Sequence, residues 1–127
     1  ILNALDAKYD TFPSLEELYQ TIHELCVDIV HSNEDGVILN FILGVGDHIF
    51  AYSWPGRRPG SSTWNGLYYM LQSNDTSDNN CCSNSAQVAV IATKPLETDS
   101  PSSWIEFNKG DFILFSNGTV NNVSKLR

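Results

Sequence analysis

The chain has 127 residues, of which 42% are hydrophobic and 11% aromatic, a composition that fits one globular domain with a sizeable core. The 15 Asp and Glu outnumber the seven Lys and Arg, so the formal net charge is -8, and no basic stripe is present. These features exclude a nucleic-acid surface and an anionic membrane surface, and no apolar run approaches the length of a bilayer span.

A helical stripe opens the sequence, with apolar side chains at Ile1, Leu2, Leu5 and Tyr9. The stripe is already in mid-pattern at residue 1, which is not Met, and no signal peptide precedes it. We therefore expect the chain to be a piece of a longer protein.

A longer helix is predicted from Ser14 to Val30. Ser14-Leu15-Glu16-Glu17 is a capping box, in which the serine hydroxyl bonds the amide of Glu17 and the Glu17 carboxylate reaches back. Apolar residues then recur at helical spacing, and the opposite face is acidic, so the helix should lie on a sheet. The residues expected to make that contact are Leu18, Ile22, Leu25 and Ile29.

Short apolar runs separated by turn residues fill the rest of the chain and predict five or six strands. No segment between them is long enough for a crossover helix, so we expect an α+β fold, an antiparallel sheet with the helices on one side. The first two runs should pair as a hairpin around Gly44–Asp47. The runs are Val37–Leu43, His48–Trp54, Leu67–Leu71, Val88–Ala92 and the segment that follows Lys109-Gly110-Asp111.

Two of these strands are apolar without alternation, Val37–Leu43 and Val88–Ala92. A strand of this kind is typical of a sheet that is covered on both faces. Two helices and one sheet do not easily supply both covers, so the pattern predicts a second layer contributed by a missing half of the domain.

The three cysteines fit neither a disulfide framework nor a metal site. Cys26 falls on the apolar side of the predicted helix, and Cys81-Cys82 lies in a polar loop. The three histidines share no metal-ligand spacing either, so we expect no metal and no cofactor. A reduced, cytoplasmic protein is the simplest interpretation, because three N-x-S/T sequons are no more than chance supplies.

The segment "VAVIATKPLETDSPSSWIEFNKGDFILFSNG" resembles the closing part of class II glutamine amidotransferase domains. In that family a buried strand ends in Ala-Ser/Thr, and a loop, a Gly turn and a last strand ending in Asp/Asn-Gly follow. Ala92-Thr93-Lys94-Pro95-Leu96 and Ser116-Asn117-Gly118 fill those places. The upstream segment from Asn40 to Tyr52 is similar to the family's strand, turn and strand ending in Ala-Tyr.

The resemblance is strongest to the compact members that act as gamma-glutamyl hydrolases in ergothioneine synthesis and glutathione breakdown. It implies an N-terminal-nucleophile hydrolase fold, an αββα sandwich, and a gamma-glutamyl small-molecule substrate. It also implies a cysteine at the mature N-terminus, whose thiolate attacks the gamma-glutamyl amide and forms a thioester. Residues 1–120 would be the C-terminal half of such a domain, partnered by its N-terminal half, and residues 121–127 a tail.

No catalytic residue can be assigned from the resemblance, because residue 1 is Ile and the family's catalytic segments precede the region matched. The parent protein is thus expected to be the enzyme, and this chain alone to be inactive. Thr93 is the one candidate substrate-pocket residue. It either shapes the pocket or satisfies backbone groups at a strand end.

Other interpretations stay open. Arg57 and Arg58 either clamp a substrate carboxylate or lie in a solvated loop. The chain could also be a non-catalytic binding or scaffold module that retains the fold and uses its acidic helix face, Glu16 to Asp28, for a partner. A secreted glycosylated β-domain is a third interpretation, which needs a signal peptide upstream.

Overall fold

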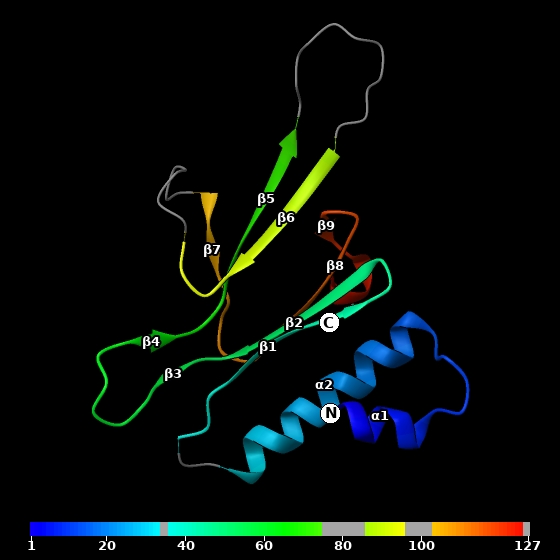
Figure 1. The fold of residues 1–127 in the computed structure, drawn as a ribbon, viewed down its shortest axis with the longest axis horizontal. Helices are drawn as coiled ribbons and strands as arrows, with labels where there is room; N and C mark the ends of the chain where they lie inside the picture. Colours follow the sequence, from blue (N-terminus) through cyan, green and yellow to red (C-terminus); the bar gives the residue numbers. More distant parts are fainter. Residues whose placement is uncertain (34–35, 75–85, 96–102, 126–127) are drawn as a thin grey trace, which may run out of the picture.

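The computed structural model describes residues 1–33, 36–74, 86–95 and 103–125. Two helices, α1 (Leu2–Lys8) and α2 (Leu15–Ser32), precede a succession of strands (Figure 1). The strands are β1 (Leu39–Val45), β2 (His48–Trp54), β3 (Gly56–Arg57), β4 (Trp64–Asn65), β5 (Tyr68–Asn74), β6 (Ala86–Ala92), β7 (Ile105–Glu106), β8 (Asp111–Ser116) and β9 (Thr119–Val120), followed by a 3-10 turn, η2 (Asn122–Lys125).

Every strand pair is antiparallel, which confirms the predicted α+β class with antiparallel sheets. The strands do not form one sheet, however. One sheet has the order β1-β2-β8-β9, another the order β6-β5-β7, and β3 and β4 form a separate two-stranded ribbon. The ribbon connects β2, at the end of which the chain leaves the first sheet, to β5 of the other sheet. Figure 1 shows the ribbon projecting away from both sheets.

The start of α2 is fixed by the predicted cap. Ser14 Oγ accepts a hydrogen bond from the Glu17 amide at 3.2 Å, which satisfies a backbone donor that the helix itself leaves free. The side chains that α2 buries include an i, i+4 series along one face. That series is Leu18, Ile22, Cys26 and Val30.

The expected contact face of α2 is therefore partly wrong. Leu18 and Ile22 are buried as predicted, whereas Leu25 and Ile29 are only half-buried. Each follows a buried residue by three positions, which places it on the flank of the buried row, where the sheet covers it incompletely.

The β1–β2 hairpin turns through two residues. Val45 pairs with His48, so only Gly46 and Asp47 connect the strands, and Gly46 has φ +56°, as a tight hairpin turn requires. The sequence predicted a four-residue turn from Gly44 and a strand ending at Leu43. Strand β1 continues for two more residues because Gly44 pairs with Ile49 in extended conformation.

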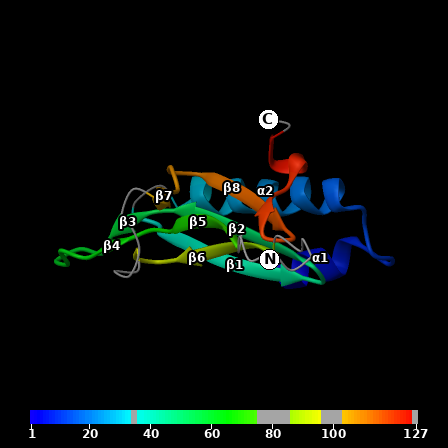
Figure 2. The same cartoon turned by 90° about the horizontal axis from the view of Figure 1, so that it is seen from above.

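The two faces of β2 lie in different cores. Phe50 and Tyr52 belong to the cluster between the first sheet and α2, where the Tyr19 hydroxyl also donates to the Phe112 carbonyl at 2.7 Å. Ala51 points to the other side, into a cluster with Leu67, Phe107 and Phe115. Figure 1 shows α2 on one side of the first sheet and β5 and β6 on the other, and in Figure 2 β5 and β6 are seen over β1 and β2.

That a layer from outside this chain completes the cover of Val37–Leu43 and Val88–Ala92 stays a prediction, and within this chain both strands are partly exposed. Ile42 is 50% exposed and Val88 37%, and no residue of Val88–Ala92 is fully buried. The reason is their position: β1 and β6 are edge strands of their sheets, so the layer opposite covers them only in part.

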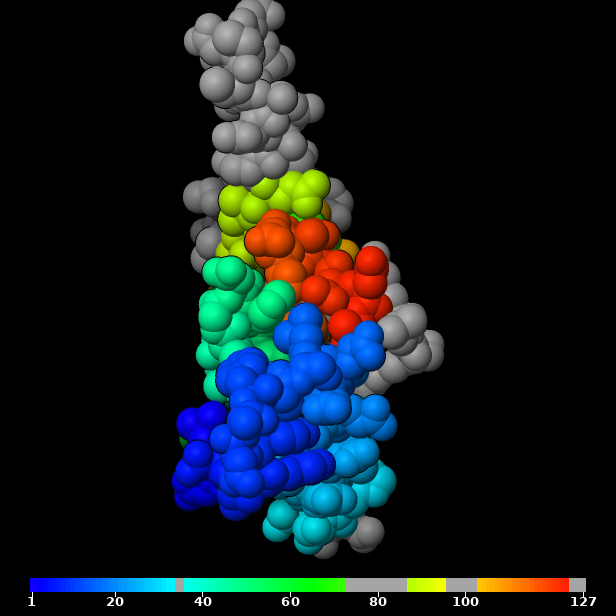
Figure 3. Space-filling view, turned by 90° about the vertical axis from the view of Figure 1, so that its right-hand side faces the viewer, coloured from blue at the N-terminus to red at the C-terminus, as the bar shows by residue number. Residues whose placement is uncertain are grey.

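The C-terminal segment, for which the sequence predicts no element, packs on the body of the protein. The Asn121 amide donates to the Leu114 carbonyl at 2.7 Å, and Val123 contacts the core beneath α2. In Figure 3 this segment, orange to red, lies between the blue helices and the yellow-green β6. An Asn117-Gly118 turn with positive φ at both residues connects β8 to β9.

We predict that Ile22→Ala lowers the free energy of unfolding by about 2–5 kcal/mol, since Ile22 is fully buried between α2 and the sheet. Leu25→Ala, on the flank of the same helix, should cost less, under about 2 kcal/mol. Urea unfolding of the two variants measures the difference, and equal losses would show that the buried row has been misplaced.

Candidate functional site

A hollow opens where three segments meet: the start of β1, the β3–β4 ribbon and the residues after β6. Its volume is about 800 Å³. Among its lining residues are Asn40, Arg58, Asn65, Tyr68, Thr93 and Lys94. We refer to it as the Asn40 cavity.

A buried hydrogen-bond relay fixes one wall of the Asn40 cavity. The hydroxyl of Ser53, which is fully buried, donates to Asn40 Oδ1 at 2.6 Å. Asn40 Nδ2 in turn donates to the Asn65 carbonyl at 3.3 Å and so connects β1 to the ribbon. Because both ends of the Asn40 amide are engaged, its orientation is set.

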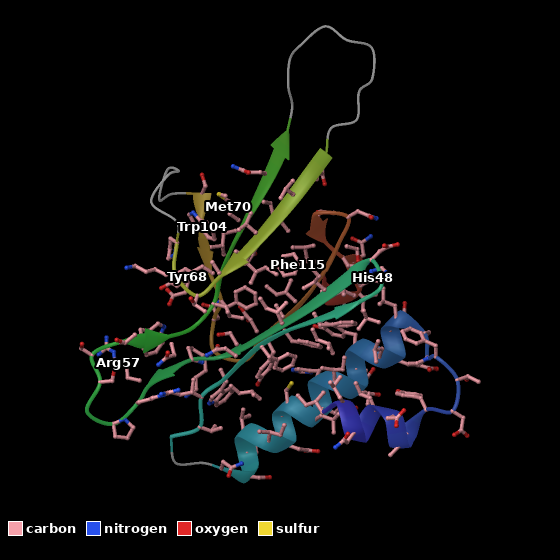
Figure 4. All side chains as sticks on the ribbon, viewed as in Figure 1. His48, Arg57, Tyr68, Met70, Trp104 and Phe115 are labelled. Atoms are coloured by element: carbon pink, nitrogen blue, oxygen red, sulfur yellow. The ribbon has the colours of Figure 1, made fainter. Side chains whose placement is uncertain are left out.

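Tyr68 presents a neutral phenol to the Asn40 cavity. Burial raises its pKa above the ordinary value, and the Glu106 carboxylate raises it further by its charge and by a hydrogen bond. Glu106 reaches Tyr68 because the two residues are direct partners in the β5–β7 pair. The ring labelled in Figure 4 therefore keeps its proton at neutral pH.

The charged residues that line the Asn40 cavity are both cations, Arg58 and Lys94. Among the described residues no carboxylate lines it, although the chain as a whole carries a net charge of -8. A positively charged hollow within an acidic protein concentrates small anions. The arrangement suits a ligand that carries a carboxylate.

Thr93 lies directly after β6 and lines the same cavity. Its side chain is exposed, and it makes no hydrogen bond to the part of the chain that the structure describes. Its contact with substrate stays a prediction. The two arginines separate: Arg58 lines this cavity, whereas Arg57 lines a neighbouring one, with its guanidinium carbon 5.7 Å from the centre of the Trp64 ring.

Cys26 cannot act as the nucleophile. It lies fully buried on the sheet-facing side of α2, and burial raises the pKa of its thiol to about 12. A thiol with that pKa carries almost no thiolate at neutral pH, and the thiolate is the attacking species. Cys81 and Cys82 lie outside the described residues.

A serine–histidine pair, which the sequence did not indicate, is structural. His48 Nδ1 lies 2.6 Å from Ser116 Oγ, and Asn121 Nδ2 donates to the same oxygen at 2.9 Å. The two residues face each other across β2 and β8, and Ser116 is buried outside the Asn40 cavity. Because the two residues are 68 positions apart in the sequence, no local motif predicts the pair.

The described residues contain no cluster of three or more His, Cys, Asp or Glu side chains placed to hold a metal ion. Over the same residues, neither helix is long and apolar enough to cross a membrane.

We predict that Cys26 resists alkylation in the folded protein. In a Cys81→Ser/Cys82→Ser variant, iodoacetamide at pH 8 should leave the remaining thiol unmodified, because it is both buried and protonated. Addition of guanidinium chloride should permit one alkylation per chain, detected by intact mass. Rapid modification without denaturant would contradict the packing of α2.

Comparison with known protein families assigns the chain to one family. The family profile of the class II glutamine amidotransferases matches residues 1–127, the whole chain. No curated protein and no solved structure gave a match. The family match agrees with the antiparallel α+β architecture, and the chain belongs to the class II glutamine amidotransferases.

Proposed function

We propose that this chain is the C-terminal half of an amidotransferase-like domain in a longer, cytoplasmic protein that hydrolyses a gamma-glutamyl amide. The observation that carries the proposal is the Asn40 cavity, a cation-lined hollow that includes Thr93, within a chain that the family matches from end to end. The nucleophile is a terminal cysteine supplied by sequence that precedes residue 1.

In the proposed reaction, the alpha-amine of that cysteine takes the thiol proton, and the thiolate attacks the gamma-carbonyl carbon. A carbon–sulfur bond forms, and the negative charge on the oxygen is held by hydrogen-bond donors. The carbon–nitrogen bond then breaks as the amine leaves with the proton from the alpha-ammonium group. Water attacks the resulting thioester, and glutamate and the free thiol are released.

The residues of this chain bind and orient the substrate. Arg58 and Lys94 attract the alpha-carboxylate of the glutamyl group, which needs a cation when it leaves water. Asn40 presents its amide in a fixed direction, because Ser53 holds its oxygen. Thr93 shapes the wall of the cavity and does not react.

The partly exposed faces of the edge strands support a second component of the proposal. Ile42 on β1 and Val88 on β6 are half-exposed apolar residues. We infer that the N-terminal half of the domain covers these edges and completes an αββα sandwich. Burying a large apolar side chain contributes about 1.5–3 kcal/mol, so these edges favour association.

We predict that Arg58→Gln in the parent enzyme raises KM for the gamma-glutamyl substrate about tenfold, with a small effect on kcat, because the lost contact is made equally in ground and transition states. Thr93→Val should raise KM less, about two- to threefold, since it keeps the shape of the side chain and removes only the hydroxyl. The matched control is Lys8→Gln, which removes a positive charge from a residue that does not line the cavity. A loss of kcat with unchanged KM in Arg58→Gln would contradict the binding role.

The decisive experiment is mass spectrometry of the parent protein after treatment with a gamma-glutamyl electrophile. We expect one adduct per chain, on a terminal cysteine upstream of Ile1, and none on Cys26. The 127-residue chain alone should form no adduct and release no glutamate. An adduct on another residue, or no adduct in a folded parent protein, would refute the proposed enzymatic activity. Either result would favour a binding or scaffold module.

A further inference from the structure

A second hollow adjoins the Asn40 cavity, since Gly36 and Ile38 line both. Its volume is about 410 Å³, and it lies between the C-terminal end of α2, the β2–β3 connection and Lys109. It has no part in the proposed reaction. We refer to it as the Lys109 pocket.

The charge of the Lys109 pocket is opposite to that of the protein. Arg57 and Lys109 line it together with His31, and no Asp or Glu is among its lining residues within the described chain. Arg57 and Lys109 are two of only seven Lys and Arg in a chain with 15 Asp and Glu. Such a concentration of cations in a hollow attracts anions.

Aromatic rings hold both cations without neutralising them. Lys109 Nζ lies 4.6 Å from the centre of the Trp54 ring, and the Arg57 guanidinium carbon 5.7 Å from that of Trp64. A ring orients a cation through its quadrupole and leaves the net charge intact. Neither cation forms an ion pair with the described part of the chain.

A closed turn positions Lys109 in advance of binding. The Asp111 amide donates to the Asn108 carbonyl at 2.9 Å, and the Asn108 amide donates to Asp111 Oδ2 at 2.8 Å. The Gly110 amide attaches the turn to the Ser53 carbonyl at 2.8 Å, beside Trp54. A ligand therefore meets a lysine whose backbone is already fixed, which lowers the entropic cost of binding.

We propose that the Lys109 pocket binds a phosphate-sized oxyanion carried by a small molecule. The planar guanidinium of Arg57, labelled in Figure 4, presents a fork of donors, and Lys109 adds a compact charge with three donors. Together they suit an anion with three or more acceptor oxygens. The proposal does not rest on the proposed hydrolase activity, because Asn40, Arg58 and Thr93 do not line this pocket, although Arg57 stacks on Trp64 of the adjoining Asn40 cavity.

The test is a titration of the isotope-labelled full chain with inorganic phosphate, followed by NMR at constant ionic strength with chloride as the reference salt. The backbone amides of Val37 and Gly56 report the Lys109 pocket, and that of Thr93 reports the Asn40 cavity. We expect saturable shifts at Val37 and Gly56 that chloride does not reproduce.

Lys109→Gln and Arg57→Gln should each weaken phosphate binding at these amides about tenfold, the effect of losing one charge-assisted contact. Lys109→Arg keeps the charge and should retain most of the affinity. Arg58→Gln is the matched control, because the neighbouring arginine lines the other hollow. Shifts that fail to saturate, or that Arg58→Gln weakens as much as Arg57→Gln, would overturn the proposal.

Discussion

The structure depends on the burial, on both faces, of the four residues 50–53 in the middle of β2. Phe50, Ala51, Tyr52 and Ser53 have exposed fractions of 0%, 0%, 1% and 0%. Because successive side chains of a strand point to opposite faces, the two aromatic residues require one covering layer and the two small residues another. Helix α2 supplies the first cover, and on the other face Ala51 packs in the cluster with Leu67, Phe107 and Phe115. The buried hydroxyl of Ser53 would cost about 1–3 kcal/mol without a partner, and Asn40 provides that partner at the wall of the cavity. The core and the candidate site thus share one strand.

Local rules predicted the elements whose causes are local. The Ser14 cap fixed the start of α2, and turn residues separated the strands in the right order. The division into two sheets was not predictable, because a periodic pattern reports that a face is buried and not which layer covers it. For the same reason Leu25 and Ile29 could not be distinguished from the fully buried Ile22: all three fit the helical stripe, and only the width of the sheet beneath them decides their exposure.

A small error of register in the predicted hairpin hides a contact of the candidate site. A four-residue turn at Gly44–Asp47 would pair Asn40 with Ala51, whereas the observed two-residue turn pairs it with Ser53. A correct prediction of the turn therefore also predicts the hydrogen-bond relay behind the cavity, because the turn sets the pairing of Asn40 with Ser53.

The placement of the adjacent Arg57 and Arg58 could not be predicted in this way. Nothing local separates them, yet they line different hollows, and the collection of cations around those hollows appears only when distant segments meet.

We propose that the glutamyl group of a substrate occupies the Asn40 cavity. A crystal structure of the parent protein with a covalently trapped gamma-glutamyl group tests this placement. We expect the trapped group between Asn40 and Thr93, with its alpha-carboxylate toward Arg58 or Lys94. A glutamyl group bound elsewhere, with the Asn40 cavity filled by other protein side chains, would contradict it.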